Sequence, residues 1–540
     1  MFSPLFDNLL EVIRSPYAIN LAAGLAVIWA LRMAYLTNRK GPRTTRLRGP
    51  PSGFFGAEEV LIESPDPAAV HEAWYKEYGA AYEIPLVLGE RKIILCDPKA
   101  LAHFFTRDSW TYVLAQADKV TLARSVGKGI LSAAGEIHRR QRRSLAPAFN
   151  STSIRKIMPL FYDCSHKLKI AWEAIIDANG SGSAIMEVQD WMNHVSLDTI
   201  GLAGFSYNFA SLDGKRGPVT SAFEAFGAAK RSSISIRFLL LLRRFPVLFH
   251  LPILSSALLN EVYKATADIS KSLFEKANKE EGRSDEKDHS IIGLLIKTED
   301  AEINKYITRE EVLAQMMTLL VAGYETTAIS MTWALLELAR HPDIQKRLRE
   351  EILSFDGEPT YDQISKDFPY FDAVVHEIFR LHPAVQDMPR MAKEDDIIPL
   401  SQPVCTKSGE FTHDIFVARG TLVGIPISFI NRSDALWGPD AKQFRPERWL
   451  EADGITPQAR ELQGYRHLLT FGDGPKMCLG KLFAIAEVKT VLWVVVKNFV
   501  LEMRDGPNTQ VERGGGMLHR PRLAGEDGAK VPLRIKRYDG

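Results

Sequence analysis

The chain has 540 residues, of which 46% are hydrophobic and 25% are charged, as in an ordinary globular protein. Its formal net charge of +1 gives no support to a nucleic-acid partner. The four cysteines are scattered without a CxxC pair, at Cys96, Cys164, Cys405 and Cys478. This pattern argues against a disulfide framework and against a zinc site, and it suits a protein in the reducing cytosol.

The N-terminal segment differs from the rest because residues 17–36 form a long apolar run. Twenty helical residues at about 1.5 Å each span about 30 Å, the hydrocarbon thickness of a bilayer. Asn20 and Arg32 interrupt the run, and Arg32 lies near its end, where its side chain can reach the interface. The alternatives are a cleaved signal peptide and a buried helix, but the run has no basic segment before it and no small-residue cleavage site after it. We therefore predict a signal anchor over residues 1–40, with its membrane helix at about 17–36.

Positive charge follows the apolar run, beginning with Arg39, Lys40 and Arg43. The positive-inside rule places the chain after these residues in the cytosol. Residues 41–56 include the sequence RGPPSG, which predicts a basic, proline-rich hinge. We expect residues 57–540 to form the main folded body of the protein.

The first part of the body contains a predicted hairpin and a basic helix. Two β-rich runs flank Gly89 within residues 80–101. Residues 136–149, EIHRRQRRSLAPAF, read as a helix with four arginines on an otherwise neutral protein. Such a helix either presents a solvated face or faces an anion or an acidic partner, and the density of arginines favours the second interpretation.

Residues 232–254 are apolar but interrupted by arginines and two prolines, so they are too broken to span a membrane. They form either core helices joined by a loop or a patch that dips into a membrane interface. The sequence does not decide between these alternatives.

The strongest helix signal begins at Thr308, which forms a capping box with Glu311 in the sequence TREE. About thirty mostly apolar residues follow before Pro342, which predicts a central buried helix. Residues 322–327, AGYETT, are unusual there, because glycine costs about 1 kcal/mol in a helix and a buried carboxylate needs a partner. Small residues allow another group to approach, and an acid beside an alcohol can relay protons. The alternative is a polar kink whose hydrogen bonds are satisfied.

A second helix, residues 368–383, places Glu377 and Arg380 three residues apart on one face. Such a pair is either a surface ion pair worth less than about 1 kcal/mol or part of a buried cluster. Arg448 lies in FRPERWL, residues 444–450, among aromatic residues and a proline. A buried cluster of Glu377 with both arginines would fix a loop through the planar guanidinium fork.

Residues 471–480, FGDGPKMCLG, place Cys478 between glycines and a proline. A lone cysteine is most often a small buried hydrophobe. Glycines, however, leave the backbone of a loop open, so that its amides can stabilise a thiolate that binds a metal.

The order of these motifs is more specific than any one of them. A basic helix, AGxETT, ExxR, PERW and FxxGxxxCxG follow one another over nearly the whole chain. This order resembles the cytochrome P-450 superfamily of haem-thiolate monooxygenases, and within it the eukaryotic, membrane-anchored microsomal class and its fungal members. The resemblance implies a mainly α fold with small β-sheets, the cytochrome P-450 fold, preceded by an N-terminal transmembrane helix.

The resemblance also implies a haem b whose iron is bound by the thiolate of Cys478. A thiolate ligand donates electron density that favours cleavage of the O–O bond. In the same loop, Gly474 and Gly480 would form the turn, and Phe471 would pack against the haem on the side of the sulfur.

Four basic residues match family positions that contact the haem propionates: His138, Arg142, Arg390 and Lys476. Two of them depart from the usual pattern. Lys476 stands where the family usually has arginine, so it offers a charge without a bidentate fork. His138 stands where the family usually has tryptophan, and it can still donate a hydrogen bond.

On the other face of the haem, Ala322 and Gly323 would leave room for O₂. Glu325 and Thr326 match the family's catalytic acid and alcohol, with Thr326 contacting the bound oxygen and Glu325 connecting it to solvent. The matching structural triad is Glu377, Arg380 and Arg448, which would brace the cysteine loop without touching substrate.

Substrate recognition in this family comes from loops between the motifs, here residues 114–131, 232–254, 384–388 and 515–518. They hold the apolar residues Val385, Met388, Met517 and Leu518, which either face substrate or pack on one another. An anchored enzyme with an apolar entrance should take lipophilic substrates. We expect a terpenoid or a sterol-like skeleton, ahead of fatty acids and polycyclic aromatics.

The expected function is that of a monooxygenase of the endoplasmic reticulum membrane, single-pass with a cytosolic catalytic domain, in fungal secondary metabolite biosynthesis. The chain shows no flavin or nicotinamide fingerprint, so electrons from NADPH must come through a separate NADPH–cytochrome reductase, with cytochrome b5 as a further donor. One alternative is a haem-thiolate isomerase or dehydratase of an oxygenated lipid, which would turn over without reductase. Another is a haem-binding membrane protein without enzymatic activity, in which an acid–alcohol pair would have no use.

Overall fold

The computed structural model describes residues 43–222, 257–280 and 308–539, apart from residues 52, 54, 515–517 and 527, together with a few single positions outside these ranges. The predicted membrane helix at 17–36 and the apolar stretch at 232–254 therefore lie almost wholly outside the described residues. The chain divides into two compact units, Met1–Thr44 and Thr45–Gly540, and every helix and strand named here belongs to the second.

The second unit is mainly helical, as the sequence predicts. Its longer helices in the first half are α4 (Pro67–Tyr78), α5 (Pro98–Arg107), α6 (Gln116–Val126), α7 (Gly135–Leu145), α8 (Ser151–Asn179), α9 (Val188–Phe205) and α12 (Ala257–Glu280). Those in the second half are α15 (Arg309–Arg340), α16 (Pro342–Leu353), α18 (Pro369–Leu381) and α22 (Lys481–Asn498). Short helical segments join them: α3 (Glu58–Glu63), η1 (Val87–Gly89), η2 (Ala146–Phe149), α17 (Tyr361–Lys366), α19 (Ile427–Ile430), α20 (Asp434–Trp437), η5 (Pro446–Trp449), α21 (Pro457–Arg460), η6 (Tyr465–His467) and η7 (Gly474–Lys476).

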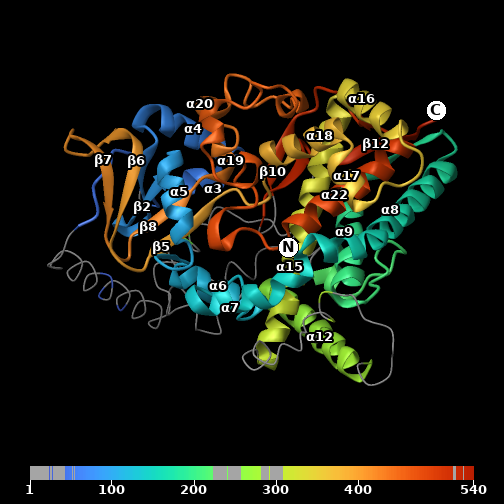
Figure 1. Cartoon of the computed structure of the whole chain (residues 1–540), viewed down its shortest axis with the longest axis horizontal. Helices are drawn as coiled ribbons and strands as arrows, with labels where there is room; N and C mark the ends of the chain where they lie inside the picture. The colour runs from blue at the N-terminus through green and yellow to red at the C-terminus, as the bar shows by residue number, and fades with distance from the viewer. Residues whose placement is uncertain are drawn as a thin grey trace, which may run out of the picture. The chain divides into compact units, whose positions relative to one another are not determined.

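The strands form small sheets. Strands β1 (Ala81–Pro85), β2 (Arg91–Leu95), β8 (Leu422–Ile425), β5 (Met388–Ala392) and β3 (Tyr112–Val113) make one sheet in that order. A second sheet has the order β4 (Ser183–Glu187), β12 (Pro532–Arg537) and β9 (Phe499–Met503). Two hairpins are β6 (Asp396–Cys405) with β7 (Phe411–Val417), and β10 (Val511–Gly514) with β11 (Arg520–Leu523). In Figure 1 the strands β2, β5, β8, β6 and β7 lie together, and so do the helices α8, α9, α15 and α22.

The predicted hairpin around Gly89 is confirmed. Strands β1 and β2 pair antiparallel from Ala81 with Leu95 to Pro85 with Arg91, and Gly89 turns between them with a φ of 77°. The chain just after Thr44 is hydrogen-bonded to this sheet. The backbone N–H of Glu83 in β1 donates to the carbonyl of Arg48 at 3.0 Å. The segment predicted as a hinge is therefore part of the body from Thr45 onward.

Helix α15 is the central element. Both halves of its capping box are present, since Glu311 N donates to Thr308 Oγ1 at 3.2 Å and Thr308 N donates to Glu311 Oε2 at 3.1 Å. Within the described ranges, Glu310–Arg340 is the one helix long and apolar enough to cross a bilayer, but 72% of its most apolar window is buried inside the protein. It is thus the core helix that the sequence predicts.

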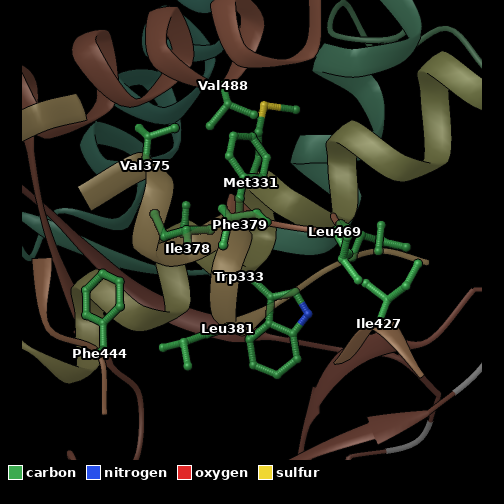
Figure 2. Packing of buried hydrophobic residues seen from close by; sticks show 14 of the residues in the cluster. Met331, Trp333, Val375, Ile378, Phe379, Leu381, Ile427, Phe444, Leu469 and Val488 are labelled. Atoms are coloured by element: carbon green, nitrogen blue, oxygen red, sulfur yellow. The ribbon is translucent and has the colours of Figure 1, made fainter. Parts of the chain in front are cut away.

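The core beside α15 is formed largely by α18, which buries one residue after another from Ala373 to Leu381. Figure 2 shows this packing, with side chains of α18 beside those of α15, α19 and the segment before the cysteine loop: Val375, Ile378, Phe379, Leu381, Met331, Trp333, Ile427 and Leu469. Large apolar side chains at this density fix the relative positions of the elements that carry the site.

A partly buried carboxylate at the junction of β4 and α9 is expected to make the stability of the fold depend on pH. Glu187 accepts hydrogen bonds from the backbone N–H groups of Gln189 at 3.1 Å and Val531 at 2.7 Å. Burial outweighs these bonds and raises the pKa of Glu187 from 4.5 to about 7. The folded protein therefore holds this proton more tightly than the unfolded chain, a contribution that is complete below about pH 4.5 and is lost as the pH rises through about 7.

We expect Glu187→Gln to have little effect near pH 5 and to raise the free energy of unfolding by about 1–3 kcal/mol near pH 8. At pH 8 the glutamate must be ionised at this site, whereas glutamine is neutral. Urea denaturation of both proteins across this range measures the difference. The control Glu350→Gln, which changes an exposed carboxylate on α16, should give a difference that does not vary with pH. A pH-independent difference for Glu187→Gln as well would contradict this account.

Candidate active site

The cysteine loop is held closed by its own backbone. Cys478 N donates to the carbonyl of Phe471 at 2.8 Å, and both Gly472 and Gly474 have positive φ, at 66° and 63°. A side chain on Gly474 would lie 2.1 Å from the carbonyl oxygen of Phe105 at the end of α5. Of the two glycines predicted to form the turn, Gly474 is therefore required by its conformation and by the close approach of two backbones, and Gly472, which was not predicted, is required by its conformation.

The side chain of Cys478 is exposed, with charged residues around it. Burial in the surrounding protein nevertheless raises its pKa. Three groups oppose that shift: a hydrogen bond from the backbone of Gly480 and the positive charges of Arg142 and Lys481. An accessible sulfur with an amide donor and two cations around it is suited to bind a metal as the thiolate.

Gly480 leaves space beside this sulfur. Its φ of −82° is ordinary, and the nearest atom to an added side chain would be a ring carbon of Phe149 at 3.9 Å. Neither strain nor a protein neighbour thus requires a glycine here, and the open face fits a planar group lying against the loop. Phe471, the predicted aromatic, is fixed edge-on by the rings of Phe379 at 5.1 Å and Tyr465 at 6.0 Å.

The structure brings together the four basic residues predicted for the propionates. Burial lowers the pKa of His138 to about 4, and the charges of Lys476, Arg142 and Arg390 contribute to that shift. Burial also lowers the pKa of Lys476 to about 8, with further contributions from Arg390 and Arg142. Like charges affect one another in this way only when they are close.

Three of these four residues are positioned by a hydrogen bond or an ion pair with another element. Arg142 donates to the carbonyl of Met477 at 2.6 Å, and Lys476 donates to the carbonyl of Ala133 at 2.6 Å. Arg390 of β5 binds the carboxylate of Asp108 at 2.8 and 3.2 Å.

Two members of this cluster are missed by the sequence motifs. Asp108 follows α5 and pairs with Arg390, and Lys119 of α6 lies close enough to lower the pKa of Lys476. Among the described residues, this cluster therefore contains one carboxylate, that of Asp108, and several positively charged side chains. Arg390 is buried, Arg142 and Lys476 are half-buried, and Lys119 is exposed. This surplus of positive charge fits a group that carries two carboxylates, as haem does.

The distal motif gives α15 its one open face. Between Ala314 and Ala339 every residue is buried except Ala322, Gly323 and Thr326, which are partly exposed. Thr326 Oγ1 donates to the carbonyl of Ala322 at 2.6 Å, so the two residues share this face one turn apart. Ala322 therefore keeps the room predicted for a small molecule.

Gly323 has a further role that the sequence does not reveal. A side chain at this position would meet Cδ1 of Ile200 in α9 at 3.0 Å, and the carbonyl of Gly323 accepts from Ser196 Oγ at 3.1 Å. The missing side chain therefore lets α15 and α9 approach each other closely.

Glu325 lies on a different side of the helix from Thr326. It is 2% exposed, and its Oε1 accepts from Arg520 of β11, from Nη2 at 2.9 Å and from Nε at 3.3 Å. The link from Glu325 to solvent that the family pattern implies is thus replaced here by a buried ion pair. The sequence carries no local signal for this partner, because the two residues are 195 positions apart.

Glu377, Arg380 and Arg448 form a buried cluster rather than a surface pair. Arg380 donates to both carboxylate oxygens of Glu377, from Nη2 at 2.8 Å and from Nε at 2.9 Å, and both side chains are 0% exposed. Arg448 Nε lies 3.5 Å from Glu377 Oε1. Two further donors that the motif does not include complete the coordination of this carboxylate: Trp449 Nε1 at 2.9 Å and Arg445 N at 3.1 Å.

The cluster reaches the cysteine loop through Asn431. Arg380 Nη1 donates to the carbonyl of Asn431 at 2.8 Å, and Asn431 Oδ1 accepts from Leu469 N at 3.1 Å. Asn431 also donates to Thr470 Oγ1, which in turn donates to the carbonyl of Phe379. These bonds fix Leu469 and Thr470, the two residues before Phe471, and so brace the start of the cysteine loop.

Comparison with known proteins agrees with this geometry. A family model described as Cytochrome P450 matches residues 49–524. Cytochrome P450 monooxygenase claQ of Ampulloclitocybe clavipes is 47% identical over 527 residues, covering 95% of this chain and 97% of that protein. Cytochrome P450 monooxygenase 128 of Postia placenta is 33% identical over 521 residues, covering 92% and 94%. The chain therefore belongs to the cytochrome P450 family of monooxygenases, which use haem bound through a cysteine thiolate.

Proposed function

We propose that this monooxygenase hydroxylates a lipophilic small molecule, a terpenoid or a sterol-like compound in fungal secondary metabolism, with O₂ and electrons that a reductase takes from NADPH. The observation that carries the proposal is the exposed Cys478, which has a backbone donor and the charges of Arg142 and Lys481 around it and lies close to the cluster of basic residues.

The haem would be held by Cys478 as the axial ligand, with Arg142, His138, Arg390 and Lys476 toward its propionates. Bound in this way, haem supplies the activation of O₂ that lets one oxygen atom enter a C–H bond while the other leaves as water. Burial raises the pKa of Cys478, whereas the amide of Gly480 and the charge of Arg142 favour the thiolate that would bind the iron. Lys481 adds a third stabilising interaction.

Ala322 and Thr326 supply the open face of α15 on which a substrate and its oxygen would meet. The hydroxyl of Thr326 donates its hydrogen to the carbonyl of Ala322. Its lone pairs therefore remain available to accept a hydrogen bond from a second donor. This arrangement supports a monooxygenase over the alternative isomerase or dehydratase of an oxygenated lipid, which needs no proton delivery to O₂.

Thr326→Ala is expected to lower the product formed per NADPH and to raise the peroxide released, by about tenfold or more in their ratio, because a positioned proton carrier is lost. Peroxide and product are measured against NADPH consumed. The matched control is Thr332→Ala, since Thr332 lies on the same helix and donates to the carbonyl of Ala328 in the same way, at 2.8 Å, but is fully buried. Equal coupling in the native chain and in Thr326→Ala would contradict the role of Thr326.

The lipophilic substrate class is supported by apolar side chains in the described parts of the predicted recognition segments. Val385 is 39% and Leu131 is 41% exposed, and Met388 is partly buried against the cysteine loop, 3.5 Å from the position of a side chain on Gly472. Apolar surface of this kind favours substrates that partition into a membrane. The segment at 232–254 lies almost wholly outside the described residues.

The electron donor would dock on the basic helix α7. Arg139 and Arg143 are exposed, although Arg139 also pairs with Glu136, whereas Arg140 is paired with Glu311 and Arg142 bonds to the cysteine loop. An acidic reductase, or cytochrome b5, would therefore meet Arg139 and Arg143. Membrane attachment would come from the helix at 17–36, which would place the protein in the endoplasmic reticulum membrane with the body in the cytosol.

The decisive experiment is expression with a reductase in microsomes, followed by a panel of terpenoids, sterols and fatty acids. A compound that shifts the haem spin state and gives a hydroxylated product with NADPH supports the proposal. Turnover of an oxygenated lipid that continues without reductase and NADPH would favour the isomerase or dehydratase. Hydroxylation of the fatty acids alone would mean that fatty acids, and not terpenoids or sterols, are the substrate class.

A further inference from the structure

We propose that Arg513 is a positioning residue for substrate specificity. It fixes the hairpin β10–β11 against α15 and α18, and in this way it sets where Leu518, just before β11, stands relative to the open face of α15. Leu518 is half-buried and packs against the hydrophobic core. The inference rests on the proposed function, because it adds a control of specificity to a residue predicted to face substrate.

The hairpin lies beside the part of α15 that carries the distal motif. Arg520, at the start of β11, donates to Glu325 from Nη2 at 2.9 Å, and Glu325 directly precedes Thr326 of the open face. Leu518 is two residues before Arg520, so it belongs to the same end of the hairpin. A shift of β10, whose Gly514 pairs with Arg520, would therefore move Leu518 relative to a substrate on the open face.

Arg513 reaches from β10 to two helices. Its guanidinium lies over the ring of Trp333 in α15, 5.2 Å from the ring centre. Its Nη2 donates to the carbonyl of Leu381 in α18 at 3.3 Å and lies 3.4 Å from Nδ1 of His382. The rings of Trp333 and His382 are stacked, with centres 3.9 Å apart and planes 7° from parallel. A planar guanidinium fits this place because it stacks on a ring and donates hydrogen bonds at the same time.

Glu337 of α15 makes His382 an acceptor for Arg513. Burial lowers the pKa of His382 to about 4, so near pH 7 the imidazole is neutral and carries one ring hydrogen. Its Nε2 lies 2.8 Å from Oε1 of Glu337. Burial alone would raise the pKa of Glu337, but the hydrogen bond with His382 and the charge of Arg340 help to lower it. The ring hydrogen is therefore on Nε2, and Nδ1 is left to accept from Arg513.

The charge of Arg513 is unfavourable at this place. Burial lowers its pKa to about 9, and the charge of Arg432 contributes to that shift, whereas Asp66 and Glu337 oppose it. The guanidinium is therefore still charged near pH 7, and an apolar side chain of similar length should allow the chain to fold as well. Such a side chain makes no directed bond to the end of α18, so it would pack against the helices without orienting the hairpin.

The first test needs neither turnover nor substrate. Backbone hydrogen exchange in the purified full chain reports how firmly each strand is held. We expect Arg513→Met to speed exchange of the amides of β10 and β11 by about tenfold or more, with Arg513→Lys between this variant and the native chain. The matched control is Arg522→Gln, which removes a pair within the hairpin, with Glu512, and should change exchange by less than about threefold. Unchanged exchange in Arg513→Met would overturn the proposal.

The second test compares two probes that bind haem iron through a nitrogen and shift its spectrum. Imidazole extends little beyond the iron, whereas 4-phenylimidazole needs room and apolar contacts for its ring. We expect Arg513→Met to raise the dissociation constant of 4-phenylimidazole about three- to tenfold and that of imidazole less than about twofold. An equal change for both probes, or no change, would overturn the proposal. A native chain that binds neither probe would overturn the proposed function, and the exchange result would still decide whether Arg513 fixes the hairpin.

Discussion

Cys478→Ala is expected to abolish the long-wavelength Soret band of the reduced protein under carbon monoxide, because this band requires a thiolate bound to iron. Replacing residues that only support metal ligands typically costs 10- to 100-fold, so loss of the ligand itself should lower hydroxylation by at least about 100-fold. The fold should survive, since the loop is closed by backbone bonds such as Cys478 N to the carbonyl of Phe471. Spectra, haem content and far-ultraviolet circular dichroism are measured together.

The matched control is Cys405→Ala, which removes a half-buried thiol at the end of β6 and should leave the band and the activity intact. A second variant, Cys478→Ser, keeps the size of the side chain and should also lose the band, which separates loss of the ligand from damage to the loop. An intact band in either Cys478 variant, or a missing band in the native protein, would contradict the assignment of the ligand.

Features encoded within a few residues of sequence could be predicted. The capping box of Thr308 and Glu311 satisfies backbone donors within one turn, and it forms as the sequence indicates. The loop around Cys478 turns at Gly474, one of the two glycines predicted for it, because glycine tolerates the positive φ found there. The mainly helical fold also follows from local patterns and from the resemblance to the family.

Features that depend on distant partners could not be predicted. Arg390 matches a family position, but its pairing with Asp108 joins residues 282 positions apart. Arg520 is 195 positions from Glu325, and neither residue carries a mark of the other. Gly323 is recognisable as small, whereas the neighbour that requires it to be small, Ile200, is set by the packing of two helices. Such pairings are decided when the elements pack, so a single sequence does not contain a local signal for them.

Glu377→Ala is expected to lower the free energy of unfolding by about 3–5 kcal/mol, because it leaves the guanidinium of Arg380 buried without a carboxylate, while Arg448 keeps Asp440 at 3.0 Å. Arg380 and Arg448 are 0% and 1% exposed and are both oriented by Glu377. Because this cluster is bonded through Asn431 to the segment before Phe471, haem retention should fall along with stability. Urea denaturation and the Soret band, followed in the same samples, measure both effects.

The chain offers a control with the same sequence spacing. Glu136 and Arg139 also form an ExxR pair on a helix, at 2.8 Å, but their side chains are 64% and 71% exposed. Water screens such a pair, so Glu136→Ala should change the free energy of unfolding by no more than about 0.5 kcal/mol. Replacing Glu377, Arg380 and Arg448 together by apolar residues should recover part of the stability lost in Glu377→Ala, because no charge then remains buried. Similar losses in Glu136→Ala and Glu377→Ala would mean that burial does not determine what this pair contributes, and the bracing role of the cluster would have to be abandoned.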